Sequence, residues 1–491
     1  MKLSSIREYL FYLLIFIIPW QTRWIIRDPY LGGEVWEYGR ISLYGWDILL
    51  VILVIISWPL VWQEIKNVKL KPRFNPADGG VVTKATKNQN DPPPGHYEES
   101  ASGGRRGNLK RLLRFARNDN FYVYLFLLLF SLTSTLWSGD KLLALVWSLR
   151  LLEGGLLWLL VRALKPKWAA VCWSLLAAGT LQAGWAITQF ITQASFANKW
   201  LGVAVHPLTQ GGTSVVMNEY GRWLRAYAGQ VHPNVLGGLL VVTLLATAWL
   251  YANRIKNHES RITNVILLFC YLLQLSGLFF TFSRGAWLGL FLSLVFWWWR
   301  EKRNVIARSE TTKQSLEVAA SAIRRTRNDN PISSVIIISA LAVIILGIIY
   351  WQPLSGRFTG QSTLEQQSIE DRRGSIKQSG QILSSKWLLG TGIGNYTAQL
   401  SENMPGLKAW RYQPVHNIFL LVFTELGVIG LLLFFGLWLN AFLRKPFAIS
   451  HSLLAAVLVT AMFDHYWWTA PSMFLLLWVI IVGIAPKTET P

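Results

Sequence analysis

The sequence predicts an all-α, polytopic membrane protein, and three properties lead to this fold class. Of its 491 residues, 52% are hydrophobic and only 15% are charged, whereas soluble domains average about 25% charged residues. Apolar runs long enough to cross a bilayer recur along nearly the whole chain. Many of the 26 tryptophans lie near the ends of these runs, where membrane-interface belts place aromatic side chains. Together these properties exclude the soluble enzyme classes.

Run length and apolar patterning predict about twelve membrane-spanning helices. Lys2 and Arg7 precede the first apolar run and no small-residue cleavage site follows it, so we expect a retained first span and not a signal peptide. Lys and Arg are enriched in the loops that this assignment places inside, so both termini are expected in the cytoplasm. The expected spans are 9–26, 44–62, 121–137, 142–161, 168–190, 234–252, 263–282, 285–299, 332–351, 417–442, 451–468 and 471–485.

Polar segments divide the spans into blocks. Two of these segments are basic cytoplasmic inserts, and both contain the sequence Arg-Asn-Asp-Asn. Their composition predicts disorder. They are either translated repetitive DNA that exposed loops tolerate, which we favour, or tails that bind anionic lipid or a partner. The expected organisation is N-terminal transmembrane helices in 1–62, an insert in 63–120, a transmembrane core in 121–303 with an outer loop at 191–233, an insert in 304–331, and a C-terminal transmembrane core in 332–485 with a large outer loop at 352–416.

The net charge of +21 does not indicate nucleic-acid binding, because the basic residues lie mostly between apolar runs, as membrane topology requires. The two cysteines, Cys172 and Cys270, both lie inside apolar runs. A disulfide framework or a thiolate metal site is therefore not expected. The chain has no Asp-x-Asp, no His-Glu-x-x-His and no phosphate-binding Walker loop. We expect no metal and no cofactor.

Polar clusters on the expected outer face are the candidate site. Arginine presents planar, bidentate donors that suit a diphosphate, although arginines also anchor helix ends at headgroup level. His416 stands at the mouth of a span and can accept a proton near neutral pH. The clusters are Arg225 with His232, Pro233 and Asn234; Ser283, Arg284 and Gly285; Arg372 and Arg373 followed by Gly390, Gly392 and Gly394; and His416 and Asn417 followed by Glu425.

A glycine-rich segment, a glutamate and an intramembrane ion pair are the remaining features of interest. The glycines of Gly390-x-Gly392-x-Gly394 predict a tight turn and lack the strand and helix context of a dinucleotide site. Glu425 lies nine residues after His416, about half a turn out of phase on a helix, so we do not expect it to orient His416 directly. Arg150 and Glu153 share one face of a span, as either a functional or a structural pair.

These motifs, in this order, resemble the O-antigen ligase and polymerase-like family of integral-membrane glycosyltransferases over roughly residues 120–485. The resemblance implies a GT-C-like helical fold in the bacterial inner membrane with its active site on the outer face. It also implies inverting, metal-independent transfer from a polyprenyl-diphosphate-linked glycan donor to a glycan, lipid or protein acceptor. Arg225, Arg284 and Arg372 or Arg373 would hold the diphosphate, and His416 would act as the base or contact the phosphate. The substrate-binding residues implied are Arg372, Arg373, Ser283, His232, Asn234 and Asn417.

Two other function classes fit a chain with many spans. A transporter or a lipid-linked oligosaccharide flippase would explain the intramembrane pair Arg150 and Glu153. Transporters show internal repeats and polar sites at mid-membrane, whereas the polar motifs here gather at one face. A scaffolding membrane protein is the other alternative. The sequence favours the glycosyltransferase.

Overall fold

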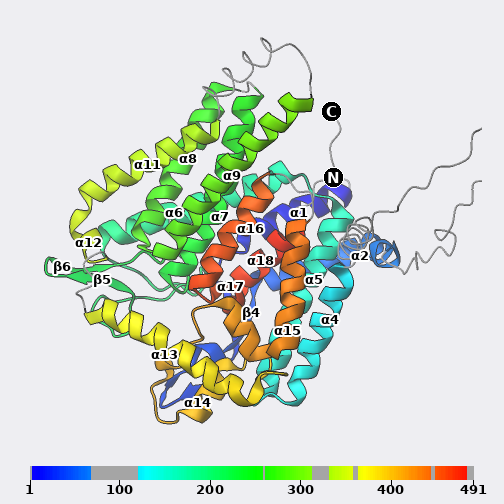
Figure 1. Cartoon of the computed structure of the whole chain (residues 1–491), viewed down its shortest axis with the longest axis vertical. Helices are drawn as coiled ribbons and strands as arrows, with labels where there is room; N and C mark the ends of the chain where they lie inside the picture. Colours follow the sequence, from blue (N-terminus) through cyan, green and yellow to red (C-terminus); the bar gives the residue numbers. More distant parts are fainter. Residues whose placement is uncertain are drawn as a thin grey trace, which may run out of the picture.

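The computed structural model describes residues 3–67, 120–257, 260–311, 331–357, 363–443 and 448–483, which form a mostly helical bundle (Figure 1). Each of the expected spans overlaps a helix. The first span is shorter than expected, because its helix ends at Ile17, just before Pro19, and residues 23–26 belong to a β-strand. Within the described residues, 7 of these helices are long and apolar enough to cross a membrane, and shorter apolar helices accompany them. The chain is therefore a polytopic membrane protein. Most of the two basic inserts lies outside the described residues.

The N-terminal part places small hairpins between its first two helices. β1 pairs with β4 and β2 pairs with β3, both antiparallel. The elements are α1 (Leu3–Ile17), β1 (Arg23–Arg27), β2 (Tyr30–Leu31), β3 (Glu34–Val35), β4 (Ile41–Tyr44) and α2 (Gly45–Asn67), with a short 3-10 helix at Glu37–Gly39.

The middle of the chain supplies the centre of the bundle. Asp140 caps α5 by accepting a hydrogen bond from the Leu143 backbone N–H, and Pro233 occupies the first turn of α7. The elements are α4 (Asn120–Thr133), α5 (Lys141–Leu164), α6 (Trp168–Thr192), β5 (Val215–Asn218), β6 (Gly221–Leu224), α7 (Pro233–Lys256), α8 (Arg261–Phe280) and α9 (Arg284–Thr311), with a 3-10 helix at Ser134–Leu136.

The C-terminal part contains a long polar helix, α13, between spans. Two of its expected spans are interrupted. The helix α15 is broken at Gly427, whose φ of 63° places it in the left-handed region, and α16 ends at Phe463 instead of continuing to 468. The elements are α11 (Pro331–Ile349), α12 (Trp351–Ser355), α13 (Thr363–Lys386), α14 (Tyr396–Asn403), α15 (Ile418–Leu443), α16 (Ala448–Phe463), α17 (Tyr466–Thr469) and α18 (Pro471–Gly483), with a 3-10 helix at Ala409–Arg411.

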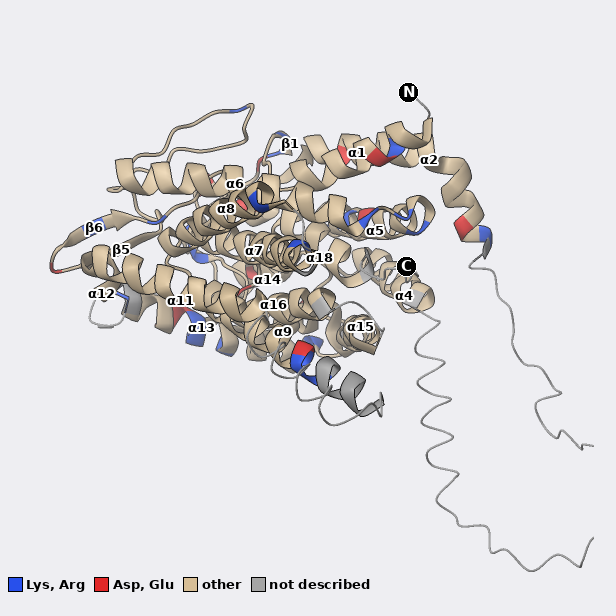
Figure 2. Ribbon diagram, turned by 90° about the horizontal axis from the view of Figure 1, so that it is seen from above, with Lys and Arg blue, Asp and Glu red and all other residues tan. Residues whose placement is uncertain are grey.

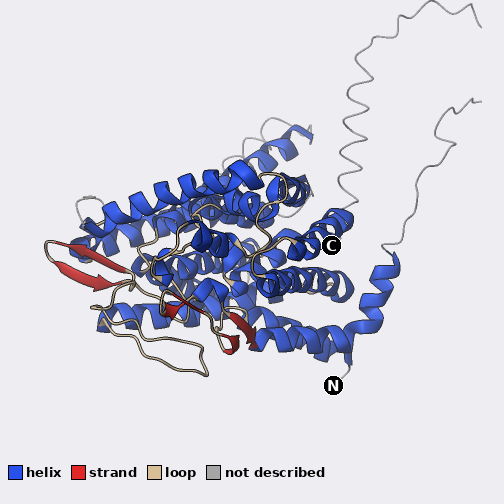
Figure 3. Cartoon of the chain, turned by 90° about the horizontal axis from the view of Figure 1, so that it is seen from below, coloured by secondary structure: helices blue, strands red, loops and turns tan. Residues whose placement is uncertain are grey.

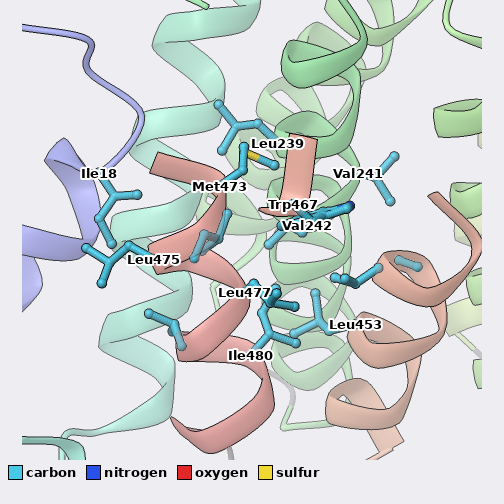
Figure 4. Packing of buried hydrophobic residues seen from close by; sticks show 14 of the residues in the cluster. Ile18, Leu239, Val241, Val242, Leu453, Trp467, Met473, Leu475, Leu477 and Ile480 are labelled. Atoms are coloured by element: carbon cyan, nitrogen blue, oxygen red, sulfur yellow. The ribbon is translucent and has the colours of Figure 1, made fainter. Parts of the chain in front are cut away.

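The helix α7 forms the centre of the core, because it packs against α6, α8, α9 and α16 and is the most deeply buried of the candidate spans. Leu239, Val241 and Val242 of α7 meet apolar side chains of α16, α17 and α18 (Figure 4). Two glycines bring its first turns close to its neighbours. A Cβ at Gly237 would lie 2.9 Å from the Ala286 Cβ, and one at Gly238 would overlap the Tyr466 ring. The starts of α7, α9 and α17 are thus held together.

The non-spanning elements gather at one end of the bundle. In Figure 1 the β5–β6 hairpin and α12 lie at the left margin and α13 and α14 lie at the lower margin, whereas α1 begins on the right. Charged residues lie mainly at the margins of a largely uncharged interior (Figure 2), and the strands are confined to loops outside the helices (Figure 3). This end corresponds to the two long loops that the sequence places on the outer face.

Candidate functional site

A cavity of about 450 Å³ lies at the end of the bundle where the long loops meet. Its walls come from six segments of the chain: the β5 region, the loop that leads into α7, the turn between α8 and α9, the residues just after α12 with the first half of α13, the loop before α15 that contains His416, and the α16–α17 junction. The polar lining residues used below are Ser214, Arg225, His232, Asn234, Ser283, Arg284, Arg357, Asp371, Arg372, His416 and Asp464.

The structure brings together most of the residues that the sequence singled out. Seven of the nine predicted site residues line this one cavity: His416, Arg284, Arg225, Arg372, Ser283, His232 and Asn234. Arg373 and Asn417 do not line it. Because the seven come from positions spread over almost two hundred residues of chain, their convergence is a property of the tertiary structure.

Arg225 is a fixed part of the cavity wall. It is buried, and its guanidinium donates from Nε to the Thr281 carbonyl (2.7 Å), from Nη1 to Ser214 Oγ (2.7 Å) and from Nη2 to Asn234 Oδ1 (2.6 Å). These contacts tie the loop after β6 to the α8–α9 turn and to the start of α7. Its position is therefore set by the protein before any ligand binds, and its positive charge stays at the cavity.

A carboxylate that the sequence interpretation did not select continues this network. Asp464 is buried, and its Oδ2 accepts a hydrogen bond from Asn234 Nδ2 at 2.7 Å, while its Oδ1 accepts from the His465 backbone N–H at 2.8 Å. The sequence predicts a continuous span over 451–468, which would include Asp464, but the helix ends at Phe463. A charged residue in an apolar run is a default functional candidate, and that signal could have identified it.

His416 lies beside Asp464. Its Nδ1 is 3.5 Å from Asp464 Oδ1, and its ring centroid is 5.1 Å from that of His465. Burial opposes charge on Asp464, but the adjacent His416, together with His465 and His232, holds the pKa of this carboxyl below its usual value. Asp464 is therefore an anion at neutral pH, and it faces the histidine at the cavity wall.

The other two histidines of this region are neutral at pH 7. Burial, and then the positive charge of Arg225, lower the pKa of His232 to about 3, and burial lowers the pKa of His465 to about 4. His232 Nδ1 accepts a hydrogen bond from the Asn234 backbone N–H at 3.1 Å. Since this nitrogen is an acceptor, the proton of the neutral ring is on Nε2.

Two helices begin at the cavity. The first turn of α7 contributes Asn234, and α9 begins with Arg284 at the cavity wall, directly after Ser283. Phe282, just before this start, adopts a φ of 48°, a conformation that is rare for a residue with a side chain. Helix N-termini attract anions through their unpaired N–H groups and the helix dipole. The turn therefore presents a site suited to negative charge.

Three arginines besides Arg225 line the cavity: Arg284, Arg372 and Arg357. Arg357 was not among the predicted residues, because it lies just after α12 in a part of the long loop without a recognisable motif. Arg284 Nη1 lies 3.4 Å from the Arg357 carbonyl oxygen, which accepts from it. The acidic residues of the lining are Asp371 and Asp464. Four guanidinium groups against two carboxylates leave the cavity cationic.

The remaining predicted residues have other surroundings. Arg373 is exposed on α13. Asn417 caps α15, since its Oδ1 accepts from the Leu420 N–H at 2.9 Å, and its Nδ2 donates to the Met462 carbonyl at 3.2 Å. It therefore holds the helix after His416 against the end of α16. This contact places His416 near Asp464, which follows Met462 by two residues.

Glu425 acts at a distance from the cavity, as its phase relative to His416 suggested. Its carboxylate accepts hydrogen bonds from the backbone N–H groups of Gly394 (2.9 Å) and Tyr396 (3.4 Å) and from Trp468 Nε1 (2.8 Å). Gly394 has a φ of 72°, in agreement with the tight turn predicted for the glycine-rich segment. Glu425 thus joins this turn to α17, whose first residues follow Asp464 and His465.

Arg150 has a structural environment away from the cavity. It pairs with Asp47 of α2 and with Glu153 (2.9 Å), and its Nη2 donates to the Ser42 carbonyl at 2.7 Å. Its guanidinium also lies 5.3 Å from the centroid of the Tyr44 ring. The arginine therefore links α5 to β4 and α2 and does not line the cavity.

One group of side chains has the composition of a metal site. Single ligand atoms of His416, Asp464 and His465 lie within 4.8 Å of one another. Asp464 and His465 already have protein partners: Asn234 donates to the carboxylate, and His465 Nδ1 lies 2.7 Å from Thr469 Oγ1. The three side chains therefore belong to a hydrogen-bonded network. Their ligand atoms are also close enough together to bind a transition metal.

Comparison with known families agrees with the motifs. Residues 269–435 match the family described as O-antigen ligase, which confirms the resemblance drawn from the sequence. The match includes Ser283, Arg284, Arg372 and His416, whereas Arg225 and Asp464 lie outside it and join the site through the fold. No match to the chain was found among curated proteins.

Proposed function

We propose that this chain is a membrane glycosyltransferase that moves a glycan from a polyprenyl diphosphate to an acceptor hydroxyl. The observation that carries the proposal is the cavity, which is lined by four arginines and by His416, and in which His416 lies beside a buried carboxylate. The family match supports it, because O-antigen ligases act on lipid-linked glycans. The acceptor is either a surface molecule, as for a ligase, or another repeat unit, as for a polymerase.

Arg284, Arg372 and Arg357 bind the diphosphate of the donor in this proposal. Guanidinium groups form bidentate, charge-assisted hydrogen bonds with phosphate oxygens, and the start of α9 adds backbone N–H donors. Arg225 contributes a fixed charge and holds the wall. As the bond between the sugar and the phosphate breaks, negative charge grows on the leaving diphosphate. Groups that are already in place stabilise this charge without reorganisation.

His416 activates the acceptor. Asp464 favours the tautomer of His416 that carries a proton on Nδ1, which leaves Nε2 free to accept one. The acceptor oxygen attacks the anomeric carbon, its proton passes to Nε2, and the polyprenyl diphosphate departs with the electrons of the broken C–O bond. A single displacement of this kind inverts the anomeric configuration. Asp464 is a positioning residue, because it acts through His416.

The arginines and the helix N-termini supply the charge neutralisation that a metal ion provides in other transferases, so the proposed reaction is metal-independent. The positive-inside pattern of the sequence supports placing the cavity on the outer face, and the family match supports a location in the bacterial inner membrane. A GT-C-like arrangement of about twelve spans is consistent with the helices present.

The test is a transfer assay with the full chain in proteoliposomes, using a polyprenyl-diphosphate glycan and separate candidate acceptors. We expect acceptor-dependent release of polyprenyl diphosphate, with strong loss in His416→Ala and Arg284→Ala. The acceptor that supports turnover distinguishes a ligase from a polymerase. Unchanged turnover in both variants would refute the assigned roles. Transbilayer movement of the donor without glycan transfer would instead support the flippase alternative.

A further inference from the structure

The helix α13 carries an apolar stripe that no described part of the chain covers. Ile369 and Ile376 are 40% and 58% exposed, and Leu383 is partly exposed. At 100° per residue these three positions fall within about 40° of arc. Trp387, the residue that follows the helix, is 54% exposed. A stripe of large apolar side chains on a polar, 24-residue helix is a surface that needs an apolar partner.

The stripe lies directly beside the face of α13 that packs on the protein. Ser375, Ser379 and Ile382 are buried, Arg372 lines the cavity, and these positions occupy the adjoining sector of the helical wheel. The exposed Arg373 and Lys377 flank the stripe on its other side. Around the helix, the face that packs on the protein is followed by the apolar stripe, then by the two basic residues and then by the polar face. An apolar face next to a polar face rich in basic residues is typical of helices that lie in a membrane interface.

The position of α13 in the fold is consistent with a helix that lies in a membrane interface. It runs across the outer ends of the helices, from the α12 side toward α14 (Figure 1). Its C-terminal end is fixed to α15, because the Val428 backbone N–H donates to the Trp387 carbonyl at 2.9 Å. The helix lies along the end of a membrane-spanning bundle, where the available apolar phase is the acyl region of the outer leaflet.

We propose that α13 is an interfacial helix that docks on the outer leaflet of the bilayer. Its apolar stripe enters the acyl boundary, and Arg373 and Lys377 meet anionic headgroups. Arg372, 60° from Ile369 on the helical wheel at 100° per residue, then lies at headgroup depth. The cavity can then bind the phosphates of a membrane lipid at the depth that lipid headgroups already occupy. The inference depends on the membrane topology and not on the transfer chemistry.

Site-directed spin labelling tests the docking without an activity readout. Both native cysteines are buried, so the wild-type chain serves as the labelling blank. Ile376→Cys places a label on the stripe, and Gln381→Cys places a matched label on the exposed polar face of the same helix. The full chain is reconstituted in nanodiscs of phosphatidylcholine and phosphatidylglycerol. Collision rates with oxygen, which concentrates in lipid, and with a water-soluble nickel chelate are then measured.

We expect the ratio of oxygen to nickel collisions to be several-fold higher at position 376 than at 381. Equal and high nickel accessibility at both positions would overturn the proposal, because α13 would then stand in water. Shielding of position 376 from both reagents, with dipolar broadening between labels, would also overturn it and would show a second copy of the chain on the stripe. Ile369→Cys provides an independent stripe position if the first variant does not fold.

Discussion

Asn234 Nδ2 donates a hydrogen bond of 2.7 Å to Asp464 Oδ2 across 230 positions of sequence. The other side-chain atom of Asn234, Oδ1, accepts from Arg225, and the other oxygen of Asp464 faces His416. One amide thus connects a cavity arginine to the carboxylate beside the candidate base. The charges of the site are placed by this network, which gives the residues around it distinct, testable roles.

Asp464→Asn should reduce kcat for glycan transfer by about 10²-fold, the lower range for general-base catalysis, with little change in KM for the donor. The neutral amide still accepts from Asn234 but no longer stabilises a positive charge on His416. Initial rates in proteoliposomes measure this effect. Asp371→Asn is the matched control, since Asp371 lines the cavity but lies 3.9 Å from Arg411 and not beside the histidine. Equal rates in both variants would contradict the role of Asp464.

Arg372 and Arg373 are neighbours with different expected effects. Arg372 lines the cavity and Arg373 does not, so Arg372→Gln should raise the apparent Kd for polyprenyl diphosphate about tenfold, corresponding to about 1.4 kcal/mol. Arg373→Gln, measured under the same conditions in detergent, should change this Kd by less than about twofold, because an exposed charge outside the site contributes little. Inhibition of transfer by added polyprenyl diphosphate measures both constants. A larger loss in Arg373→Gln would place the phosphates elsewhere.

Glu425→Ala should destabilise the protein. Removal of the carboxylate leaves the Gly394 N–H, the Tyr396 N–H and Trp468 Nε1 without their acceptor, and buried unpaired donors cost about 1–3 kcal/mol each. Thermal unfolding in detergent should show a clearly lower Tm. The control is Glu402→Ala, which removes an exposed carboxylate of α14 and should not change Tm. An unchanged Tm in Glu425→Ala would show that the turn and α17 are held by other contacts.

The protein should lose stability as pH falls from 7 toward 4. Burial lowers the folded-state pKa of His465 to about 4, whereas an unfolded histidine has a pKa of about 6.5. Between these values the unfolded chain binds more protons, so the free energy of unfolding rises with pH. At pH 5 this one group lowers the free energy of unfolding by roughly 2 kcal/mol relative to its value at high pH. The shift of His232 acts in the same direction.

Measuring Tm across this pH range in one detergent shows whether stability falls on acidification, as expected. His465→Gln removes the titrating group and should flatten the dependence relative to the wild type. A steeper dependence in this variant, or a wild-type Tm that rises on acidification, would contradict a neutral buried His465.

Metal chelation and metal addition should have opposite outcomes. Transfer should survive treatment with EDTA, because the proposed reaction draws its positive charge from arginines. Zn²⁺ should inhibit it, since His416, Asp464 and His465 have ligand atoms within 4.8 Å of one another, and a bound zinc ion would replace the contact between His416 and Asp464 that orients the base. His465→Gln should weaken the zinc inhibition at least several-fold. Loss of transfer on chelation, restored by a divalent ion, would contradict the proposal.

The sequence alone determined that this is a membrane protein and gave the approximate ranges of most of its helices. It also pointed to one end of the bundle for the candidate site. These properties follow from local patterns: the length of apolar runs, the position of arginines next to them, and glycines such as Gly394, whose φ of 72° a turn requires. A single segment contains all the information that such predictions need. For the same reason Arg225, Arg284 and His416 could be selected before their neighbours were known.

Only the tertiary structure decided which of these residues meet. It added Asp464 and Arg357 to the cavity, excluded Arg373, and gave Asn417 a capping contact instead of a place in the lining. It also showed that the ion pair of Arg150 includes Asp47, 103 positions away. Contacts between distant segments depend on how helices pack, through close approaches such as that at Gly238, and the local sequence pattern of either segment does not specify them.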